Sequence, residues 1–326
     1  MEKTLLSIDD LSVAYGDIQI VKHFSMDIHR GEIVGIVGES GSGKSTMLKS
    51  ILGLLDAPGH LTGGNILFND EAIPYSDIKA MSRLRGGQIS FVFQSPEQSL
   101  DPLYTIREQF RECVHVHQEL TDQEIDALAG DILKKLQFKD VDKVLNAYPF
   151  ELSGGMCQRV VIAMAMANKA ALFLADEPTS ALDVTVQKEV LNILKSMRDQ
   201  YGLTIFIVSH NMGVIAEMAD TIGVMYHGKL IEAGRCQEVI KTPGHSYTRA
   251  LIQAIPRADG QRPAAINGAP VAFGMETGTC DYYNRCHFRT EQCAVPPTEK
   301  KYFTRTHWML CHQEIDSEVW HEAVGN

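Results

Sequence analysis

The residues best suited to chemistry stand in a glycine-rich segment, residues 38–45. It spells GESGSGKS, fits the pattern G-x-x-x-x-G-K-[ST] and directly follows the apolar run 33–37. Glycines let the backbone wrap tightly, so that successive N–H groups point at phosphate oxygens, and the helix that follows directs its positive end at them. We expect Lys44 to reach the β- and γ-phosphates of a nucleotide and the Ser45 hydroxyl to ligate Mg²⁺. A flexible Gly/Ser turn is the alternative. The candidate nucleotide-binding residues here are Gly38, Ser40, Gly41, Gly43, Lys44, Ser45 and Thr46.

Two neighbouring carboxylates, Asp176 and Glu177, follow the apolar run 172–175. A buried strand that ends in acids is costly unless a cation lies there. Asp176 therefore suits a ligand on the Mg²⁺ side, and Glu177 suits a general base that takes a proton from an attacking water. Acids at strand ends are common, and it is their position after a phosphate-binding loop that favours the functional interpretation.

A third segment, Leu152-Ser153-Gly154-Gly155, precedes an apolar helix expected over residues 160–167. Ser153 can cap that helix, and Gly154 and Gly155 leave its first amides uncovered, which makes a second anion site. Taken alone, the segment is explained better as an ordinary capped helix.

Composition limits what kind of protein this is. The chain has 326 residues, 44% of them apolar, and a formal net charge of −11. That length suits one large α/β domain and a small appendage, and the acidic balance argues against nucleic-acid binding. The first residues lack a basic start followed by an apolar core, so we expect no secretory signal. The nearest candidate for a membrane span, residues 160–175, is interrupted by Asn168 and Lys169, so other chains would have to hold the protein at a membrane.

The elements that must position these residues follow from hydrophobic periodicity. Residues 1–30 alternate apolar and polar side chains, which predicts a small antiparallel sheet. The apolar runs 33–37, 171–175 and 203–208 predict buried strands of a parallel sheet. The overall pattern is that of an α/β core.

Two further regions differ from this core. Residues 96–167 predict a mostly helical subdomain, in which Thr121 and Glu124 form a capping-box pattern. Periodicity is lost from Pro256 onward, so we expect one domain over residues 1–255 and an irregular C-terminal extension over residues 256–326.

The combination of a phosphate-binding loop, LSGG-x-x-Q and an apolar strand ending in Asp-Glu resembles the ATP-binding cassette (ABC) ATPases, over about residues 4–255. The resemblance implies an α/β P-loop NTPase fold with a RecA-like parallel-sheet core, an antiparallel β subdomain and a helical subdomain. It also implies bound ATP and Mg²⁺. Tyr15 matches the aromatic residue that stacks on adenine, and Asp183 lies in the segment SALD, which matches the D-loop. Gln94 matches the glutamine that links Mg²⁺ to the transmembrane partner, and His210 matches the switch histidine at the γ-phosphate.

The same resemblance assigns roles and partners. Glu177, His210 and Gln94 would be catalytic, and Ser45, Gln94 and Asp176 would hold Mg²⁺. Two cassettes would pack head to tail, so that Ser153 completes the partner's site and ATP joins the pair. The implied partners are a second related ATPase subunit, as a heterodimer, two transmembrane permease subunits and, indirectly, an extracytoplasmic substrate-binding protein. The chain would be peripheral at the cytoplasmic face of the cell membrane. Cys157 departs from the family, where many relatives carry Arg, and we expect a modest effect.

The subfamily resemblance narrows the transported substrate. The segments FQSP, LDP and LSGGMCQR, with PGHSYTRAL at residues 243–251, look like the ATPase subunits of bacterial oligopeptide and dipeptide importers. Nickel importers share the first of these, so import of nickel or a metal chelate is the alternative. A soluble ABC ATPase is more distant, since those usually carry two cassettes or a coiled-coil insertion. The presence of Lys44, Asp176, Glu177 and His210 argues against a non-catalytic cassette.

Four of the seven cysteines lie close together in the extension, with the spacing C-x5-C-x6-C-x17-C. Four thiols in a short irregular segment suggest a metal that staples it, and tetrathiolate sites suit zinc or an iron–sulfur cluster. The resemblance to peptide-importer ATPases with this tail implies a [4Fe–4S] cluster, which we expect here, with zinc or no metal as alternatives. His287 and His312 could substitute but are better explained as exposed loop residues. The expected cluster ligands are Cys280, Cys286, Cys293 and Cys311.

Overall fold

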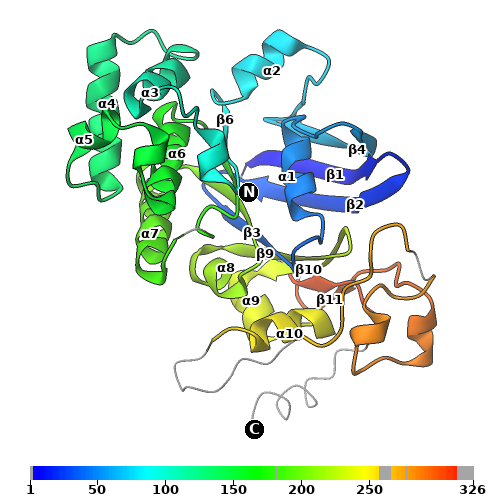
Figure 1. The fold of residues 1–326 in the computed structure, drawn as a ribbon. Coiled ribbons are helices and arrows are strands. Elements are labelled where there is room, and N and C mark those ends of the chain that lie inside the picture. The colour runs from blue at the N-terminus through cyan, green and yellow to red at the C-terminus, as the bar shows by residue number, and fades with distance from the viewer. Residues whose placement is uncertain (1–2, 181, 257–265, 276–277, 314–326) are drawn as a thin grey trace. The chain divides into compact units, whose positions relative to one another are not determined.

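The computed structural model describes residues 3–180, 182–256, 266–275 and 278–313 (Figure 1). The chain forms two compact units, here called unit 1 and unit 2. Unit 1 consists of Met1–Leu5, Ile28–Ile33 and Glu71–Ile207. Unit 2 consists of Leu6–Asp27, Val34–Asp70 and Val208–Asn326.

Unit 2 holds two sets of strands. The strands that lie wholly or mainly in it are β1 (Thr4–Tyr15), β2 (Ile18–His29), β3 (Ile33–Val37), β4 (Gly59–Phe68), β9 (Thr221–Tyr226), β10 (Lys229–Arg235), β11 (Lys301–Tyr302) and β12 (Trp308–Met309). One set has the order β2-β1-β4, and β1 runs antiparallel to β4 with Leu6 opposite Phe68. The other has the order β11-β12-β10-β9-β3, in which β3 and β9 are parallel and the remaining pairs are antiparallel.

Unit 2 also contains helices. They are α1 (Lys44–Ile51), α8 (Met212–Met218), α9 (Cys236–Lys241) and α10 (Ser246–Gln253). The C-terminal extension adds two short 3-10 turns, η3 (Tyr283–Arg285) and η4 (Glu291–Ala294), before β11 and β12. These elements are drawn in orange and red in Figure 1. The extension therefore contributes strands to the sheet of unit 2.

Unit 1 combines a short sheet with most of the helices. Its strands are β5 (Glu71–Ala72), β6 (Ile89–Val92), β7 (Leu172–Asp176) and β8 (Thr204–Ser209). Its helices are α2 (Ile78–Leu84), η1 (Pro96–Ser99), α3 (Ile106–His115), α4 (Asp122–Lys135), α5 (Val141–Leu145), η2 (Pro149–Glu151), α6 (Gly154–Ala167) and α7 (Val184–Tyr201). The sheet order is β8-β7-β6, and β6 and β7 are parallel with Ile89 opposite Leu172. Every residue of β7 and β8 is buried.

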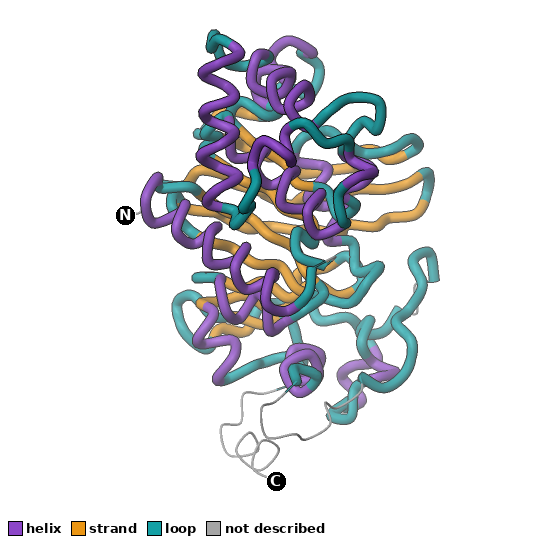
Figure 2. The backbone as a smooth tube through the Cα atoms, turned by 60° about the vertical axis from the view of Figure 1, so that its left-hand side comes forward, coloured by secondary structure: helices purple, strands orange, loops and turns teal. Residues whose placement is uncertain are grey.

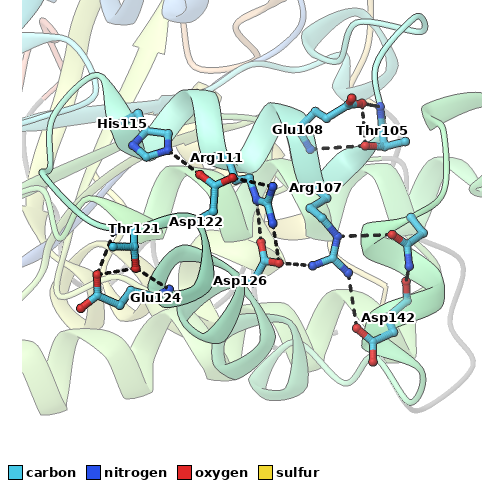
Figure 3. A network of polar contacts seen from close by, with 11 residues as sticks. Thr105, Arg107, Glu108, Arg111, His115, Thr121, Asp122, Glu124, Asp126 and Asp142 are labelled. Atoms are coloured by element: carbon cyan, nitrogen blue, oxygen red, sulfur yellow. Dashed lines mark hydrogen bonds and ion pairs between the residues drawn. The ribbon is translucent and has the colours of Figure 1, made fainter.

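The helices α3, α4 and α5 are joined by a polar network on their surface (Figure 3). The Arg111 guanidinium donates to both oxygens of Asp126, at 2.9 and 2.7 Å, and to Asp122 at 2.8 Å. Arg107 donates to the same Asp126 and to Asp142. The hydrogen bond from Arg111 holds the pKa of Asp126 below its usual range. The helical part of unit 1 is thus fixed by charge as well as by packing.

The fold predicted from the sequence is confirmed as a mixed α/β fold with parallel and antiparallel strands. Figure 2 shows its helices in purple and its strands in orange. β3 has the predicted bounds, and β7 and β8 each begin one residue later than predicted. The capping box at the start of α4 is present, with Thr121 and Glu124 bonded reciprocally. Among the helices in the described part of the chain, none has the length and apolar character needed to span a bilayer.

Candidate functional site

The phosphate loop of unit 2 links β3 to α1. Gly38 packs against the main chain of Met225, and a Cβ at Gly38 would lie 2.2 Å from the Met225 carbonyl oxygen. Gly43 has a φ of 96°, which disfavours any residue with a side chain, and it serves as the N-cap of α1. Both positions require glycine for the loop to keep this shape.

Lys44 lies inside this loop. Its Nζ donates to the carbonyl oxygens of Gly38 and Glu39, at 2.8 and 2.9 Å, and lies 3.2 Å from the Ser42 hydroxyl. The side chain is buried, so the ammonium is fixed in the concave side of the loop. Such a cation, surrounded by glycine backbone, can attract phosphate oxygens strongly.

The first turn of α1 carries the remaining loop residues. No side chain caps its N-terminus, because Gly43 stands at the N-cap. Ser45 and Thr46 follow Lys44 in this turn and are half-buried. The backbone amides of this turn and the two hydroxyls provide the kinds of donor and oxygen ligand that a nucleotide with Mg²⁺ requires.

Unit 2 also holds Tyr15 and His210. His210 follows β8, is exposed, and lines a cavity of about 560 Å³ together with Glu39 and Ser40 of the loop. The structure thus brings the predicted switch histidine beside the loop. Tyr15 ends β1 opposite Gly59, where a Cβ would lie 2.9 Å from the tyrosine ring.

The two predicted carboxylates lie at the end of β7 in unit 1. Asp176 and Glu177 are 3% and 8% exposed. The Nε2 of Gln94 donates to the Glu177 Oε2 at 3.2 Å, so these two predicted catalytic residues are in contact although 83 positions separate them. Glu177 has a φ of 49°, in the left-handed region, which fixes its side chain at a tight turn out of the strand.

The segment after Glu177 begins helix α7. Ser180 returns a hydrogen bond to the Glu177 carbonyl through both its hydroxyl and its N–H, at 3.1 and 3.2 Å. Asp183 caps α7 by accepting the N–H groups of Thr185 and Val186 at 3.0 Å each. Ala181, the second residue of the predicted D-loop, lies outside the described residues.

Ser153 of the LSGG segment caps a helix as predicted, but helix α6 begins at Gly154 and not at the expected residue 160. Ser153 is its N-cap and accepts the N–H of Met156 at 3.3 Å. A Cβ at Gly155 would lie 3.2 Å from the Leu182 side chain, so the first turn is narrow there. Cys157, the departure from the family pattern, is buried with its Sγ 3.5 Å from the Pro149 carbonyl oxygen.

These residues have the chemistry that MgATP needs. The Ser45 hydroxyl, the Gln94 amide and the Asp176 carboxylate offer oxygen ligands, which Mg²⁺ prefers. The loop supplies backbone amides and the Lys44 ammonium. Within unit 2, the Lys44 ammonium donates to the loop backbone and His210 lines a cavity with residues of the loop. Within unit 1, Gln94 donates a hydrogen bond to Glu177.

The prediction of an iron–sulfur cluster is wrong. Among the residues that the structure describes, no three or more His, Cys, Asp or Glu side chains are placed to hold a metal ion. The thiols instead make separate contacts, with Cys286 Sγ 3.4 Å from the Ser246 hydroxyl and Cys293 Sγ 3.7 Å from the Thr290 hydroxyl. Burial raises the pKa of the Cys280 thiol to about 11.

One contact of the loop had no signal in the sequence. Glu39 occupies a variable position of the loop pattern, and its carboxylate pairs with Arg285 of the extension, 246 residues away. Neither residue could be predicted from the sequence, because nothing in their local pattern marks them as partners.

Comparison with family models places two matches on the chain. Residues 21–180 match the model described as ABC transporter, and residues 231–293 match the model described as oligopeptide/dipeptide transporter, C-terminal region. The first match includes the phosphate loop, the LSGG segment and both carboxylates. The second includes Arg285 and three of the four clustered cysteines.

Similar curated proteins are transport ATPases by name. The dipeptide transport ATP-binding protein DppD of Escherichia coli is 36% identical over 319 residues, which are 96% of this chain and 97% of that protein. The peptidoglycan transport ATP-binding protein YejF of Agrobacterium fabrum is 41% identical over 274 residues. This alignment covers 81% of the chain but only about half the length of YejF.

Similar solved structures are cassettes. A dimeric ATP-binding cassette, MJ0796, bound to ADP and Pi in a post-hydrolysis state, has a TM-score of 0.65 at 29% identity and covers 71% of this chain and 99% of its own. The structure of cbiO1 from Clostridium perfringens, part of the ABC transporter complex cbiONQ, has a TM-score of 0.64 at 29% identity and covers 74% of this chain and 92% of its own.

Proposed function

This chain belongs to the ATP-binding subunits of ABC transporters, and from that membership we propose that it is the ATP-hydrolysing motor of a bacterial importer for dipeptides or oligopeptides. The observation that supports hydrolysis best is the contact between Gln94 and Glu177 at the end of β7, beside the buried Asp176. A glutamine amide on a carboxylate positions that carboxylate and couples it to the segment that carries the glutamine.

In this proposal each residue has a separate task. Lys44 and the loop amides bind the phosphates, and Glu177 takes a proton from the attacking water. His210 contacts the γ-phosphate, and Tyr15 stacks on adenine. Mg²⁺, when bound, neutralises charge that develops on the phosphates. Ser45, Gln94 and Asp176 are the residues that would hold it.

Two substitutions test this division. Lys44→Ala is expected to lower the affinity for MgATP at least tenfold, because the ammonium binds phosphates in the ground state. Glu177→Gln is expected to keep that affinity and lower kcat at least a hundredfold, because the carboxylate acts only when water attacks. Affinity is measured with a fluorescent ATP analogue and turnover by phosphate release.

Each substitution has a matched control in the same unit of the chain. Lys49→Ala removes a lysine of the same helix, where it faces Asp56 at 3.4 Å on the surface, and should leave affinity and turnover near the parental values. Glu119→Gln removes an exposed carboxylate of unit 1 and should do the same. Hydrolysis at the parental rate by Glu177→Gln would show that the assigned base is wrong.

The peptide substrate is supported by the match of residues 231–293 to the oligopeptide/dipeptide model and by the dipeptide transport protein at 36% identity. The chain itself makes no contact with the transported molecule in this scheme. Uptake of labelled dipeptides and of nickel by membrane vesicles that contain the reconstituted transporter separates the two substrate classes. Nickel uptake without peptide uptake would contradict the proposal.

We further propose that a permease helix docks on a groove of unit 1. This groove has a volume of about 570 Å³, is lined by residues on both sides of Gln94 in the chain, and exposes Phe93, Tyr104 and Val116, by 37, 52 and 62%. Aromatic and aliphatic side chains exposed around one groove are typical of a protein interface. Docking on the permease would place the chain at the cytoplasmic face of the membrane. From the family membership we also propose a second, related cassette subunit as partner.

Copurification tests this docking. Tyr104→Glu should abolish the copurification of this chain with the permease subunits and leave MgATP affinity of the isolated chain unchanged. Tyr201→Glu changes an equally exposed tyrosine that does not line the groove and should have no effect on either. Undiminished copurification of Tyr104→Glu would exclude this groove.

A further inference from the structure

A partly buried ion pair joins the phosphate loop to the C-terminal extension within unit 2. The guanidinium of Arg285 donates to both carboxylate oxygens of Glu39, with Nη1 2.6 Å from Oε2 and Nη2 2.9 Å from Oε1. The side chain of Arg285 is 3% exposed and that of Glu39 is 27% exposed. A two-pronged contact of this kind fixes the carboxylate in position and neutralises its charge.

Three tyrosines surround this ion pair. The rings of Tyr226, Tyr247 and Tyr282 lie with their centroids 4.6 to 5.4 Å apart. The guanidinium carbon of Arg285 lies 5.8 Å from the ring centroid of Tyr226 and 5.5 Å from that of Tyr282. The hydroxyl of Tyr247 also accepts the main-chain N–H of Glu39 at 2.7 Å. Both the side chain and the backbone of Glu39 are therefore held by residues outside the loop.

Glu39 places a carboxylate next to the residues that would bind the phosphates. Its carbonyl oxygen accepts the Lys44 ammonium at 2.9 Å, and its side chain lines the same cavity as His210. An uncompensated carboxylate at this position would repel phosphate oxygens, and the repulsion grows where protein excludes water. The guanidinium of Arg285 neutralises that negative charge by pairing with it.

We propose that Arg285 is a positioning residue for nucleotide binding, which neutralises and fixes the Glu39 carboxylate so that the loop can accept phosphates. The inference rests on the proposed role of this loop as the ATP site. It makes the C-terminal extension part of the nucleotide-binding apparatus of its own chain. No metal and no oxidation step in the extension is needed for this role.

A mutant cycle on the full chain tests the proposal. Arg285→Met should weaken binding of a fluorescent ATP analogue about tenfold, equivalent to about 1.4 kcal/mol, and raise KM for ATP similarly while kcat stays within about twofold. Glu39→Gln should not weaken binding, because it removes the negative charge. The double variant should bind within about twofold of Glu39→Gln, since no carboxylate is left to neutralise.

Rescue separates this role from a purely structural one. If Arg285 acted only by folding the extension, the double variant would bind as weakly as Arg285→Met, and that result would overturn the proposal. Parental affinity of Arg285→Met would overturn it as well. Arg289→Met, which removes a guanidinium stacked 5.3 Å from the Tyr283 ring in the same extension, should bind normally.

Two further measurements keep the outcome clear. Thermal unfolding establishes that each variant is folded, and Arg285→Gln replaces Arg285→Met in the same cycle if the latter does not fold. Failure of the parental chain to bind ATP, or parental affinity of Lys44→Ala, would count against the ATP site itself. A result that departs from expectation only in the Arg285 and Glu39 variants would count against the role of their ion pair and not against the ATP site.

Discussion

Replacing Glu232 by Ala is expected to detach the C-terminal extension from the sheet of unit 2. The Glu232 carboxylate is fully buried and accepts three hydrogen bonds, from the N–H groups of Gly244 and His245 at 2.6 and 2.7 Å and from the His307 Nε2 at 2.8 Å. Glu232 also stands opposite Met309 where β10 pairs with β12. One carboxylate therefore holds the α9–α10 turn and the last strand of the extension together.

The expected cost follows from those contacts. Alanine leaves three buried donors without their acceptor, and each such donor costs about 1–3 kcal/mol. Removing one side of a buried hydrogen-bonded polar pair typically costs about 3–5 kcal/mol in all. We therefore expect the free energy of unfolding to fall by about 3–5 kcal/mol, a large share of the roughly 5–15 kcal/mol of an ordinary domain.

Urea unfolding followed by circular dichroism and by the fluorescence of Trp308, in a background in which the second tryptophan is replaced (Trp320→Phe), measures this loss. Trp308 follows His307 in β12, and the Lys300 ammonium lies 4.1 Å from its ring centroid, so its emission reports on the extension. Glu238→Ala is the matched control, because Glu238 accepts the Thr306 hydroxyl at 2.8 Å on the surface. A loss below about 1 kcal/mol in Glu232→Ala, or the same loss in both variants, would refute the reasoning.

Two other predictions concern the LSGG segment and a buried histidine. Ser153→Arg should abolish ATP hydrolysis by the assembled transporter and leave ATP binding to the isolated chain nearly intact, because Ser153 would act on the nucleotide of the second cassette. Equal loss of binding in the isolated chain would contradict that assignment. Burial lowers the pKa of His245 to about 4, and its Nδ1 accepts the N–H of Tyr247 at 3.0 Å at the start of α10. The unfolded chain takes up this proton below about pH 6.5 and the folded chain only near pH 4, so stability should fall by up to about 3 kcal/mol as pH drops through that window. His245→Asn, which keeps an acceptor at the cap, should lose this part of the pH dependence in urea unfolding measured from pH 7 to 4.

Local patterns predicted the elements that carry the site. β3 and the loop after it follow from one apolar run and the glycine spacing, and the start of α6 follows from Ser153. Such signals are short-range, because a strand or a cap depends mainly on neighbouring residues. The family resemblance also assigned separate roles to Gln94 and Glu177, which the structure brings into contact.

Long-range contacts of the extension could not be predicted in this way. Arg285 and His307 contact residues 246 and 75 positions earlier, and neither lies in a periodic segment. The cysteine spacing was misleading for a related reason. Cys293 and Cys311 are buried like small apolar residues in the packing of the extension, and spacing alone does not distinguish a buried thiol from a metal ligand.

Pairing of β12 with β10 has a practical consequence for shortened versions of this chain. β10 has β9 on one side and β12 on the other, with β12 opposite Glu232 and Ala233. A chain cut at the expected domain boundary near residue 255 would lose β12 and leave the outer edge of β10 unpaired. Unpaired edges act as templates for strand addition between molecules and promote aggregation. A soluble cassette for biophysical work should therefore extend at least through Met309.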